Sequence, residues 1–263
     1  EIYTLSLHDA LPICQVKKEI RQLREGGKIL AETLRLLAEK IENEGGGNIS
    51  TKSLDKLAEQ NIRKYNAEPA FLNYNNFPAS LCVSLNDEIV HGVPREERII
   101  QTGDLIKLDF GVKYKGLFTD SAISLPVGKV SKVAYRLIDA TRQSLMLGLE
   151  QIYHGSCLGN YGAVVDRYAR KNGFSTVKDL VGHGVGYAVH EPPQITNFGK
   201  AGEGLRIEEG MVLALEPMLN EGRDEIRLAL DGLTFLTEDG KLSAHFEHTV
   251  AVTGNGCEIL TEI

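Results

Sequence analysis

The chain has 263 residues, 42% of them hydrophobic and 25% charged, and its formal net charge at pH 7 is −7. This composition is typical of a soluble globular protein with a substantial core, built as one large or two small domains. The mild acidic excess argues against a broad nucleic-acid or anionic-membrane surface, and no apolar run is long enough to span a bilayer. Four cysteines lack the paired spacing of zinc or dithiol sites, which favours unpaired thiols in the cytoplasm: Cys14, Cys82, Cys157 and Cys257.

The first thirteen residues contain no initiator methionine and no pattern that continues into the following sequence. They resemble translated sequencing-adapter DNA. A signal peptide is disfavoured, because the segment has no basic start and Asp9 and Pro12 interrupt its apolar run. We therefore expect residues 1–13 to be a non-native segment and residues 14–263 to form a single domain.

Two amphipathic helices are predicted at the start of this domain. From about residue 16 to residue 41, apolar side chains recur at helical spacing, with charged side chains on the opposite face. The glycine run at residues 45–47 would end this helix, and Ser50 or Thr51 would cap a second one. The apolar positions of the second helix are Leu54, Leu57, Ala58 and Ile62.

The remaining pattern predicts an ordered loop, a second helix pair and several short strands. Residues 65–80 are rich in Asn, Pro and aromatic side chains, and aromatics at that density need packing partners. Helices are expected at about 133–152 and 158–171. Strands are expected at 81–85, 89–91, 178–182, 211–217, 225–230, 233–237 and 246–253. Because the order helix, helix, strands occurs twice, we predict an α+β fold of two similar halves, with antiparallel strands in the middle and helices outside.

Residues 106–122 predict a β-hairpin that brings two carboxylates together. Apolar side chains alternate along its first strand, so Asp109 points to the opposite face. A reversal at Tyr114 and Lys115, with Gly116 free to take a positive φ, would place Asp109 directly opposite Asp120. Opposed like charges destabilise a sheet unless one is protonated or a cation lies between them. The hairpin therefore predicts a cation site.

Three downstream residues are candidates to complete such a site. His183 lies between glycines that allow close approach of backbone and ligand. Glu216 and Glu247 stand in otherwise apolar strands, where a charge is costly unless it is compensated. Taken singly, each has a simpler explanation, as a turn or surface acid, a loop histidine or an edge-strand charge. Their combination with the hairpin acids favours a metal site.

The ordered ligand set resembles the two-metal site of the methionine aminopeptidases and their pita-bread relatives. Its members stand in the settings LDF, TDSA, GHGVG, LALEPM and FEHTV: Asp109, Asp120, His183, Glu216 and Glu247. The resemblance runs from about residue 16 to residue 262. The segments NDEIVHGVP (86–94), HEPP (190–193) and FEHTVAVT (246–253) narrow it toward methionine aminopeptidases rather than prolidases. The short interval between His190 and Glu216 resembles the bacterial type I enzymes, and the implied fold is the pita-bread fold with pseudo-two-fold halves.

The resemblance also implies a mechanism. Asp109 would hold one divalent ion, His183 and Glu216 the other, and Asp120 and Glu247 would bridge both. The ions, Co, Mn, Fe or Zn, would share a water and lower its pKa, so that hydroxide attacks the first peptide bond of a nascent chain and releases its initiator methionine. A metal would also bind the free α-amine.

Three residues would act beside the metals. His190 would polarise the carbonyl, His91 would hydrogen-bond the incoming peptide, and Glu216 would also move a proton to the leaving amine. By resemblance, the substrate's methionine would be bound by Phe71, Tyr74, Phe77, Cys82, His91, Val189, His190 and Leu233. Val189 and Leu233 replace residues that are usually aromatic in the bacterial enzymes, so the strictness of methionine selection is left open.

The implied partners are nascent polypeptide N-termini with a small second residue, together with transient ribosome association. A monomer without nucleic-acid or membrane binding is expected. Two alternatives stay open: an Xaa-Pro-cleaving relative with the same ligands, which would usually carry an extra N-terminal domain, and a non-catalytic binding protein on the same scaffold. His245 and His248 flank Glu247, and we expect both to pack nearby rather than to bind metal.

Overall fold

The computed structural model describes residues 17–262; the segment expected to be non-native lies outside this range. The helices are α1 (Lys17–Glu44), α2 (Thr51–Arg63), η1 (a 3-10 turn, Tyr74–Asn76), α3 (Lys132–Leu149) and α4 (Leu158–Lys171). The strands are β1 (Glu68–Pro69), β2 (Leu81–Leu85), β3 (Glu88–Val90), β4 (Leu105–Tyr114), β5 (Leu117–Pro126), β6 (Ser175–Thr176), β7 (Gly182–Gly184), β8 (Glu191–Ile195), β9 (Val212–Leu215), β10 (Met218–Asn220), β11 (Ile226–Leu228), β12 (Phe235–Thr237), β13 (Ser243–His245), β14 (Glu247–Thr253) and β15 (Gly256–Ile259).

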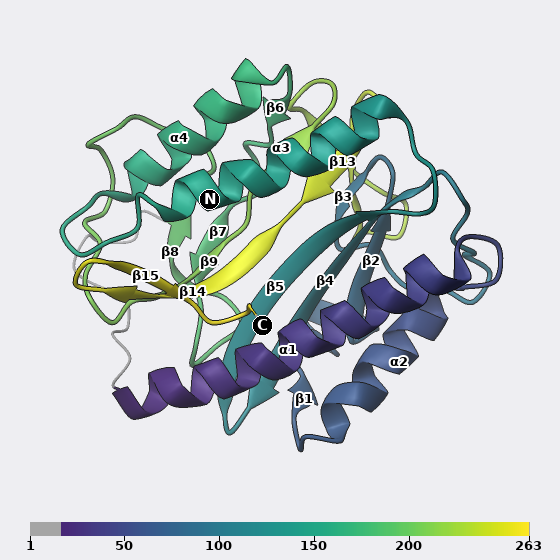
Figure 1. The fold of residues 1–263 in the computed structure, drawn as a ribbon, viewed down its shortest axis with the longest axis horizontal. Helices are drawn as coiled ribbons and strands as arrows, with labels where there is room; N and C mark the ends of the chain where they lie inside the picture. Colours follow the sequence, from purple (N-terminus) through teal and green to yellow (C-terminus); the bar gives the residue numbers. More distant parts are fainter. Residues whose placement is uncertain (1–16, 263) are drawn as a thin grey trace.

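The centre of the molecule is an antiparallel sheet in the order β1-β4-β5-β14-β9-β7-β8, with β2 added at β4 and β15 at β14. Strands β5 and β14 lie next to each other in the middle of this sheet, where they join the two halves of the chain. Two three-stranded sheets, β13-β10-β6 and β11-β12-β3, lie beside it. In Figure 1 the pair α1 and α2 covers the strands of the first half, and the pair α3 and α4 covers those of the second. The predicted α+β arrangement with outer helices is confirmed.

Each helix pair buries one apolar face of the sheet. Leu30, Leu34 and Leu37 of α1 pack with Leu108 and Phe110 of β4 in one core cluster. The second pair packs in the same way against β9 and β14, with Leu145, Tyr161, Leu213 and Val250 among its buried members. Because side chains alternate along a strand, the residues between these apolar positions face the other side of the sheet.

The helix boundaries follow from local capping. Ser50 caps α2 by accepting a hydrogen bond from the backbone N–H of Ser53, and Ser131 caps α3 by accepting from Ala134. Both predicted helix pairs are therefore confirmed, although α3 ends at Leu149, three residues earlier than expected.

The strand predictions were less accurate. The strand expected at 178–182 is wrong: Lys178 lies in a bend and pairs with Asp224, and β7 begins only at Gly182. Strands β8, β10, β13 and β15 were missed. They are three to five residues long, and two prolines in β8 hid its strand character, because proline is rare inside central strands. Short strands such as these are defined by their partners rather than by their own periodicity.

The hairpin of β4 and β5 forms, but its predicted register was wrong. Tyr114 pairs with Leu117, so the two turn residues are Lys115 and Gly116, with φ of 50° and 85°. A two-residue turn of this kind needs positive φ at both positions, which moves the turn one residue along the chain. Asp109 consequently pairs with Ala122, and Asp120 pairs with Gly111. The shift of two pairing positions leaves both aspartates on the same face, diagonal to each other.

Candidate metal centre

The five candidate ligands come from five neighbouring strands and share one face of the central sheet. Asp109 of β4 and Glu247 of β14 both pair with Ala122 of β5, from opposite sides. Asp120 lies two positions along β5 from that alanine. Glu216 directly follows β9, two residues after Ala214, which pairs with His183 of β7. The alternation of side chains therefore directs all five toward the same space, on the side away from the helices.

Distances confirm that the ligands converge. One ligand atom each from Asp120, His183 and Glu247 lies within 4.8 Å of the others. His183 Nε2 lies 3.4 Å from Glu216 Oε1. The other ring nitrogen, Nδ1, donates to the carbonyl of Gly184 at 2.9 Å, which leaves the lone pair of Nε2 facing the carboxylates. This is the tautomer that a metal ligand requires.

Backbone contacts hold the central acids in place. The backbone N–H of Asp120 donates to Thr249 Oγ1 at 2.8 Å, and that hydroxyl donates in return to the carbonyl of Asp120 at 2.7 Å. Ser121 Oγ donates to the carbonyl of Glu247 at 2.7 Å. Strands β5 and β14 are therefore locked together at the two residues that would serve both metal ions.

The charged forms of the four carboxyl groups in this site are disfavoured. Burial raises the pKa of Asp109 to about 8, and the nearby carboxyl of Glu216 adds to the shift. Burial and neighbouring carboxyls raise the pKa values of Asp120, Glu216 and Glu247 well above their ordinary range. Three buried carboxyl oxygens of the candidate ligands have no hydrogen-bond partner: Asp109 Oδ1, Asp120 Oδ1 and Glu247 Oε1. Four converging carboxyls and one imidazole fit divalent cations, which would offset the repulsion and satisfy these oxygens.

An apolar cavity opens over the carboxyl row. Besides the five candidate ligands, its lining comprises Phe71, Tyr74, Asn75, Phe77, Cys82, His91, His190 and Leu233. Seven of the eight residues expected in the methionine pocket thus lie on this surface. Val189 packs with Phe71, Phe77 and Cys82 but stands outside the lining set. Close approach of this wall to the sheet depends on Gly111, where an added Cβ would lie 2.6 Å from the Phe71 ring.

Two further histidines reach the cavity from its rim. His190 Nδ1 is hydrogen-bonded to the Tyr74 hydroxyl at 2.9 Å, and its ring lies 4.3 Å from that of His183, centroid to centroid. His91 packs edge-on against Phe235 at 5.7 Å and is open to the cavity. Its pKa is lowered to about 4 by the protein atoms around it and by His190. Burial also lowers the pKa of His190, so both imidazoles favour the neutral form, which can donate and accept hydrogen bonds.

His245 lies beside the site, as expected, and Asn75, which the sequence did not single out, lines the cavity. His245 is buried, and its Nε2 lies 3.5 Å from Glu216 Oε2. Its position two residues before Glu247 placed it on the same face, and that signal was available from the alternation alone. His248 points the other way and is hydrogen-bonded to Thr261 Oγ1 at 2.9 Å, as its position on the opposite face predicts.

The whole described domain matches a known family. The model of metallopeptidase family M24 matches residues 21–254. A methionine aminopeptidase of Clostridium perfringens is 44% identical over 251 residues, which cover 95% of this chain and 99% of the relative. The crystal structure of methionine aminopeptidase from Thermotoga maritima superposes with a TM-score of 0.93 at 36% identity, covering 96% of this chain and all of that one.

A more distant comparison concerns the fold alone. An Xaa-Pro dipeptidase from Bacillus anthracis superposes with a TM-score of 0.75 at 22% identity, and the match covers 96% of this chain but 62% of that one. The same pita-bread architecture thus occurs in a longer protein. From the family match and the near-complete coverage of its relatives, the chain belongs to metallopeptidase family M24, within its methionine aminopeptidases of bacterial type.

Proposed function

We propose that this protein removes the N-terminal methionine of nascent chains by metal-dependent hydrolysis of the first peptide bond. The observation that carries the proposal is the row of four carboxyls and one imidazole beneath an apolar cavity. The close relatives named methionine aminopeptidases support the same reaction. The chain is a hydrolase that uses divalent metal. The roles of its individual residues are part of our proposal.

The ligand assignment follows the order of the strands. Asp109, at one end of the row, would hold one ion, and His183 with Glu216, at the other end, would hold the second. Asp120 and Glu247 lie between them and would serve both ions. When bound, two divalent cations would lower the pKa of a water molecule, so that a nucleophile is available near neutral pH. Co, Mn, Fe and Zn all suit this donor set.

The side chains at the rim of the cavity would handle the peptide. His190, held by Tyr74, would donate a hydrogen bond to the carbonyl oxygen of the first peptide bond as charge develops there. His91 would hydrogen-bond the incoming peptide near the scissile amide. Glu216 would also move a proton to the leaving amine.

The aromatic end of the cavity would bind the methionine side chain. Phe71, Phe77 and Cys82 are buried and present an apolar wall suited to a flexible thioether. Burial and the nearby Asp109 raise the pKa of the Cys82 thiol, so this cysteine is a neutral wall residue rather than a nucleophile. Leu233 contributes an aliphatic surface to the same wall, and Val189 supports it from behind.

We also propose the cellular setting. The substrates are nascent N-termini, with a small second residue preferred, and the protein acts as a cytoplasmic monomer in transient contact with the ribosome. Within residues 17–262, every helix is too short or too polar to cross a membrane.

A metal titration coupled to peptide cleavage tests the proposal. The metal-free protein is titrated with Mn, Co, Fe or Zn and given Met-Ala, Met-Gly, Leu-Ala and Ala-Pro peptides at each step. We expect release of free methionine from the Met-Ala and Met-Gly peptides once metal is bound. Cleavage of the Ala-Pro peptide alone would favour the Xaa-Pro alternative. Tight metal binding without any cleavage would favour a binding protein on the same scaffold.

A further inference from the structure

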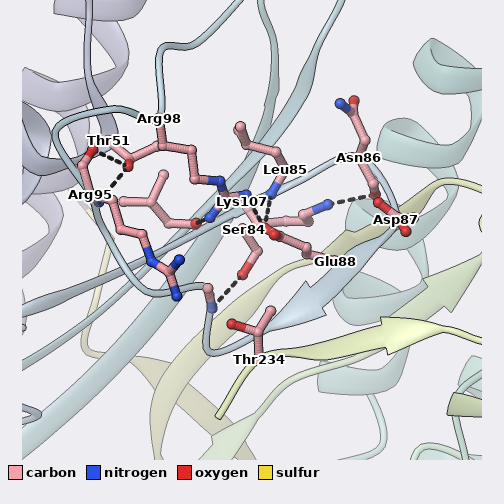
Figure 2. Close-up of polar contacts among 12 residues, drawn as sticks. Thr51, Ser84, Leu85, Asn86, Asp87, Glu88, Arg95, Arg98, Lys107 and Thr234 are labelled. Carbon is pink, nitrogen blue, oxygen red and sulfur yellow. Dashed lines mark hydrogen bonds and ion pairs between the residues drawn. The ribbon is translucent and has the colours of Figure 1, made fainter. Parts of the chain in front are cut away.

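Lys107 is a buried lysine on the polar face of the sheet, outside the ligand set. It lies on β4 and is 1% exposed. Its Nζ donates to the carbonyl of Asn86 at 2.8 Å (Figure 2). It also donates to the carbonyl of Ser243 at 3.0 Å. Its neighbours in the strand register are Ser84 of β2 and Ser124 of β5. A lysine is rarely buried so completely unless its ammonium group is bound by specific acceptors.

The two acceptors belong to segments that lead to different residues of the cavity lining, His91 and Glu247. Asn86 lies in the turn between β2 and β3, five residues before His91. Ser243 begins β13, which carries His245 and is followed at once by β14 with Glu247. The backbone N–H of Ser243 also donates to the carbonyl of Asn86 at 3.0 Å. The ammonium group therefore sits where the two segments meet and holds both of them to β4.

His91 needs such support because its backbone conformation is unfavourable. Its φ is +58°, a left-handed value that few non-glycine residues adopt and that persists only where the surroundings impose it. Thr234 Oγ1 donates to its carbonyl at 3.2 Å, and the N–H of Gly92 donates to Ser84 Oγ at 3.0 Å. At Gly92, a Cβ would lie 2.3 Å from the Val83 carbonyl oxygen, so the chain passes very close to β2.

The turn between β2 and β3 also makes contacts that do not involve Lys107. Glu88 accepts from the N–H of Leu85 at 2.7 Å and forms an ion pair with Arg98 (Figure 2). Asn86 Nδ2 donates to Asp104 Oδ1 at 2.8 Å. These contacts fold the turn upon itself and tie it to the loop before β4. The contact from Lys107 is different, because it joins the turn to β13 across the polar face of the sheet.

A purely structural role is a poor explanation for this lysine. Removing an ammonium group from water is costly, and the Lys107 side chain is almost completely buried. An apolar side chain of similar volume usually gives an equal or more stable core at such a position. The cost is understandable if the contact fixes the position of residues that act on substrate.

We propose that Lys107 is a positioning residue for His91: by binding the Asn86 and Ser243 carbonyls, it holds the β2–β3 turn, which leads through β3 to His91, against β13. This role rests on the proposed function, since His91 is assigned there to the incoming peptide. Lys107 itself is not one of the residues that line the cavity.

A double-mutant cycle tests this role. We expect Lys107→Met to lower kcat/KM for a Met-Ala peptide by about tenfold or more in the wild-type background, and by less than about twofold in the His91→Ala background, because the effect travels through His91. Lys113→Met is the matched control: it makes the same change on the same strand, at a partly exposed lysine 3.7 Å from Glu68, and should leave kcat/KM unchanged. Equal losses in both backgrounds, or no loss at all, would overturn the proposal.

Metal binding and folding are measured on the same variants. Calorimetric metal affinity should stay within about threefold of wild type. A larger fall would show that Lys107 acts through Asp109, two residues away, and would contradict the proposal. Lys107→Gln keeps two donor hydrogens without the charge and serves as a second variant if the methionine variant does not fold. If neither variant folds, as judged by circular dichroism, Lys107 is a structural residue and the proposal is wrong.

A readout that is independent of activity separates this proposal from the proposed function. The ring-proton resonances of His91 are identified in metal-free protein from their absence in the His91→Ala variant. We expect them to shift or broaden in Lys107→Met and to stay unchanged in Lys113→Met. Unchanged resonances in both would count against the positioning role. A wild-type enzyme that releases no methionine would overturn the proposed function, while the resonances would still report on Lys107.

Discussion

The two faces of strand β4 show how one segment serves both stability and chemistry. On the helix side, Leu108 and Phe110 are fully buried against α1 and α2. On the other side, Lys107 and Asp109 are equally buried, yet each carries an ionisable group. Burial is favourable on the first face and costly on the second. Burial of the apolar face therefore stabilises the fold and offsets the cost of burying ionisable groups on the polar face. Substitutions on the two faces should act in different ways.

The largest expected effect is on the polar face. Asp109→Asn removes a charged ligand while keeping the size of the side chain, so we expect turnover of a Met-Ala peptide to fall by about 10⁴-fold with the fold intact. The measurements are steady-state kinetics and calorimetric metal affinity. Asp139→Asn, at an exposed acid on α3, is the control and should behave as wild type. An active Asp109→Asn enzyme would remove Asp109 from the ligand set.

The next effect is on the helix-covered face. Phe110→Ala leaves a cavity between β4 and the helices, and we expect the free energy of unfolding to fall by about 3–5 kcal/mol. Chemical denaturation measures this change. Because the side chain points away from the cavity, the folded fraction should retain wild-type kcat with saturating metal. A loss of kcat as large as that of Asp109→Asn would show that the two faces are not separate.

The effect of added metal on stability should further distinguish the polar face of β4 from its helix-covered face. At a free metal concentration one hundred times Kd, we expect the free energy of unfolding to rise by about 2.7 kcal/mol, because metal binds the native state. Glu247→Gln removes one buried charge and should make the metal-free protein more stable while reducing the gain from metal. Glu203→Gln, at an exposed position, should change neither value. A metal-free Glu247→Gln protein less stable than wild type would contradict the electrostatic account of this site.

The smallest expected effect concerns the cavity wall. Leu233→Ala widens the apolar pocket, and we expect the ratio of kcat/KM for Met-Ala over Leu-Ala peptides to fall by about tenfold, or roughly 1.4 kcal/mol. Leu230→Ala, on the same connection between β11 and β12 but fully exposed, is the matched control. An unchanged ratio in Leu233→Ala would place methionine selection elsewhere, on Phe71 and Phe77.

Much of this molecule could be predicted from local pattern. The helix periods, the capping serine at residue 50 and the alternation in β4 all depend on residues close together in the chain, and the structure confirms them. The ligand set could be recognised for a related reason. A carboxyl in an apolar strand is costly wherever its partners lie, so Glu216 and Glu247 stood out before any fold was known.

The predictions that failed were those of features that depend on a partner strand. The turn of the β4–β5 hairpin lies one residue later than expected, because positive φ at Lys115 as well as Gly116 decides it. The strand expected at 178–182 does not form, and β8 and β13 exist because neighbouring strands pair with them. A period of two residues determines the face of a side chain, and a register shift of two leaves that face unchanged.

Residue type and local period therefore predicted which residues carry charge, which face of the β4 strand they occupy and where the helices lie in the chain. Only the tertiary structure decided that Asp109 and Glu247 flank Ala122, that His245 lies against Glu216, and that the Lys107 ammonium joins the turn before His91 to β13. These contacts join residues up to 136 positions apart, and their geometry depends on strand order and register, which no local pattern encodes.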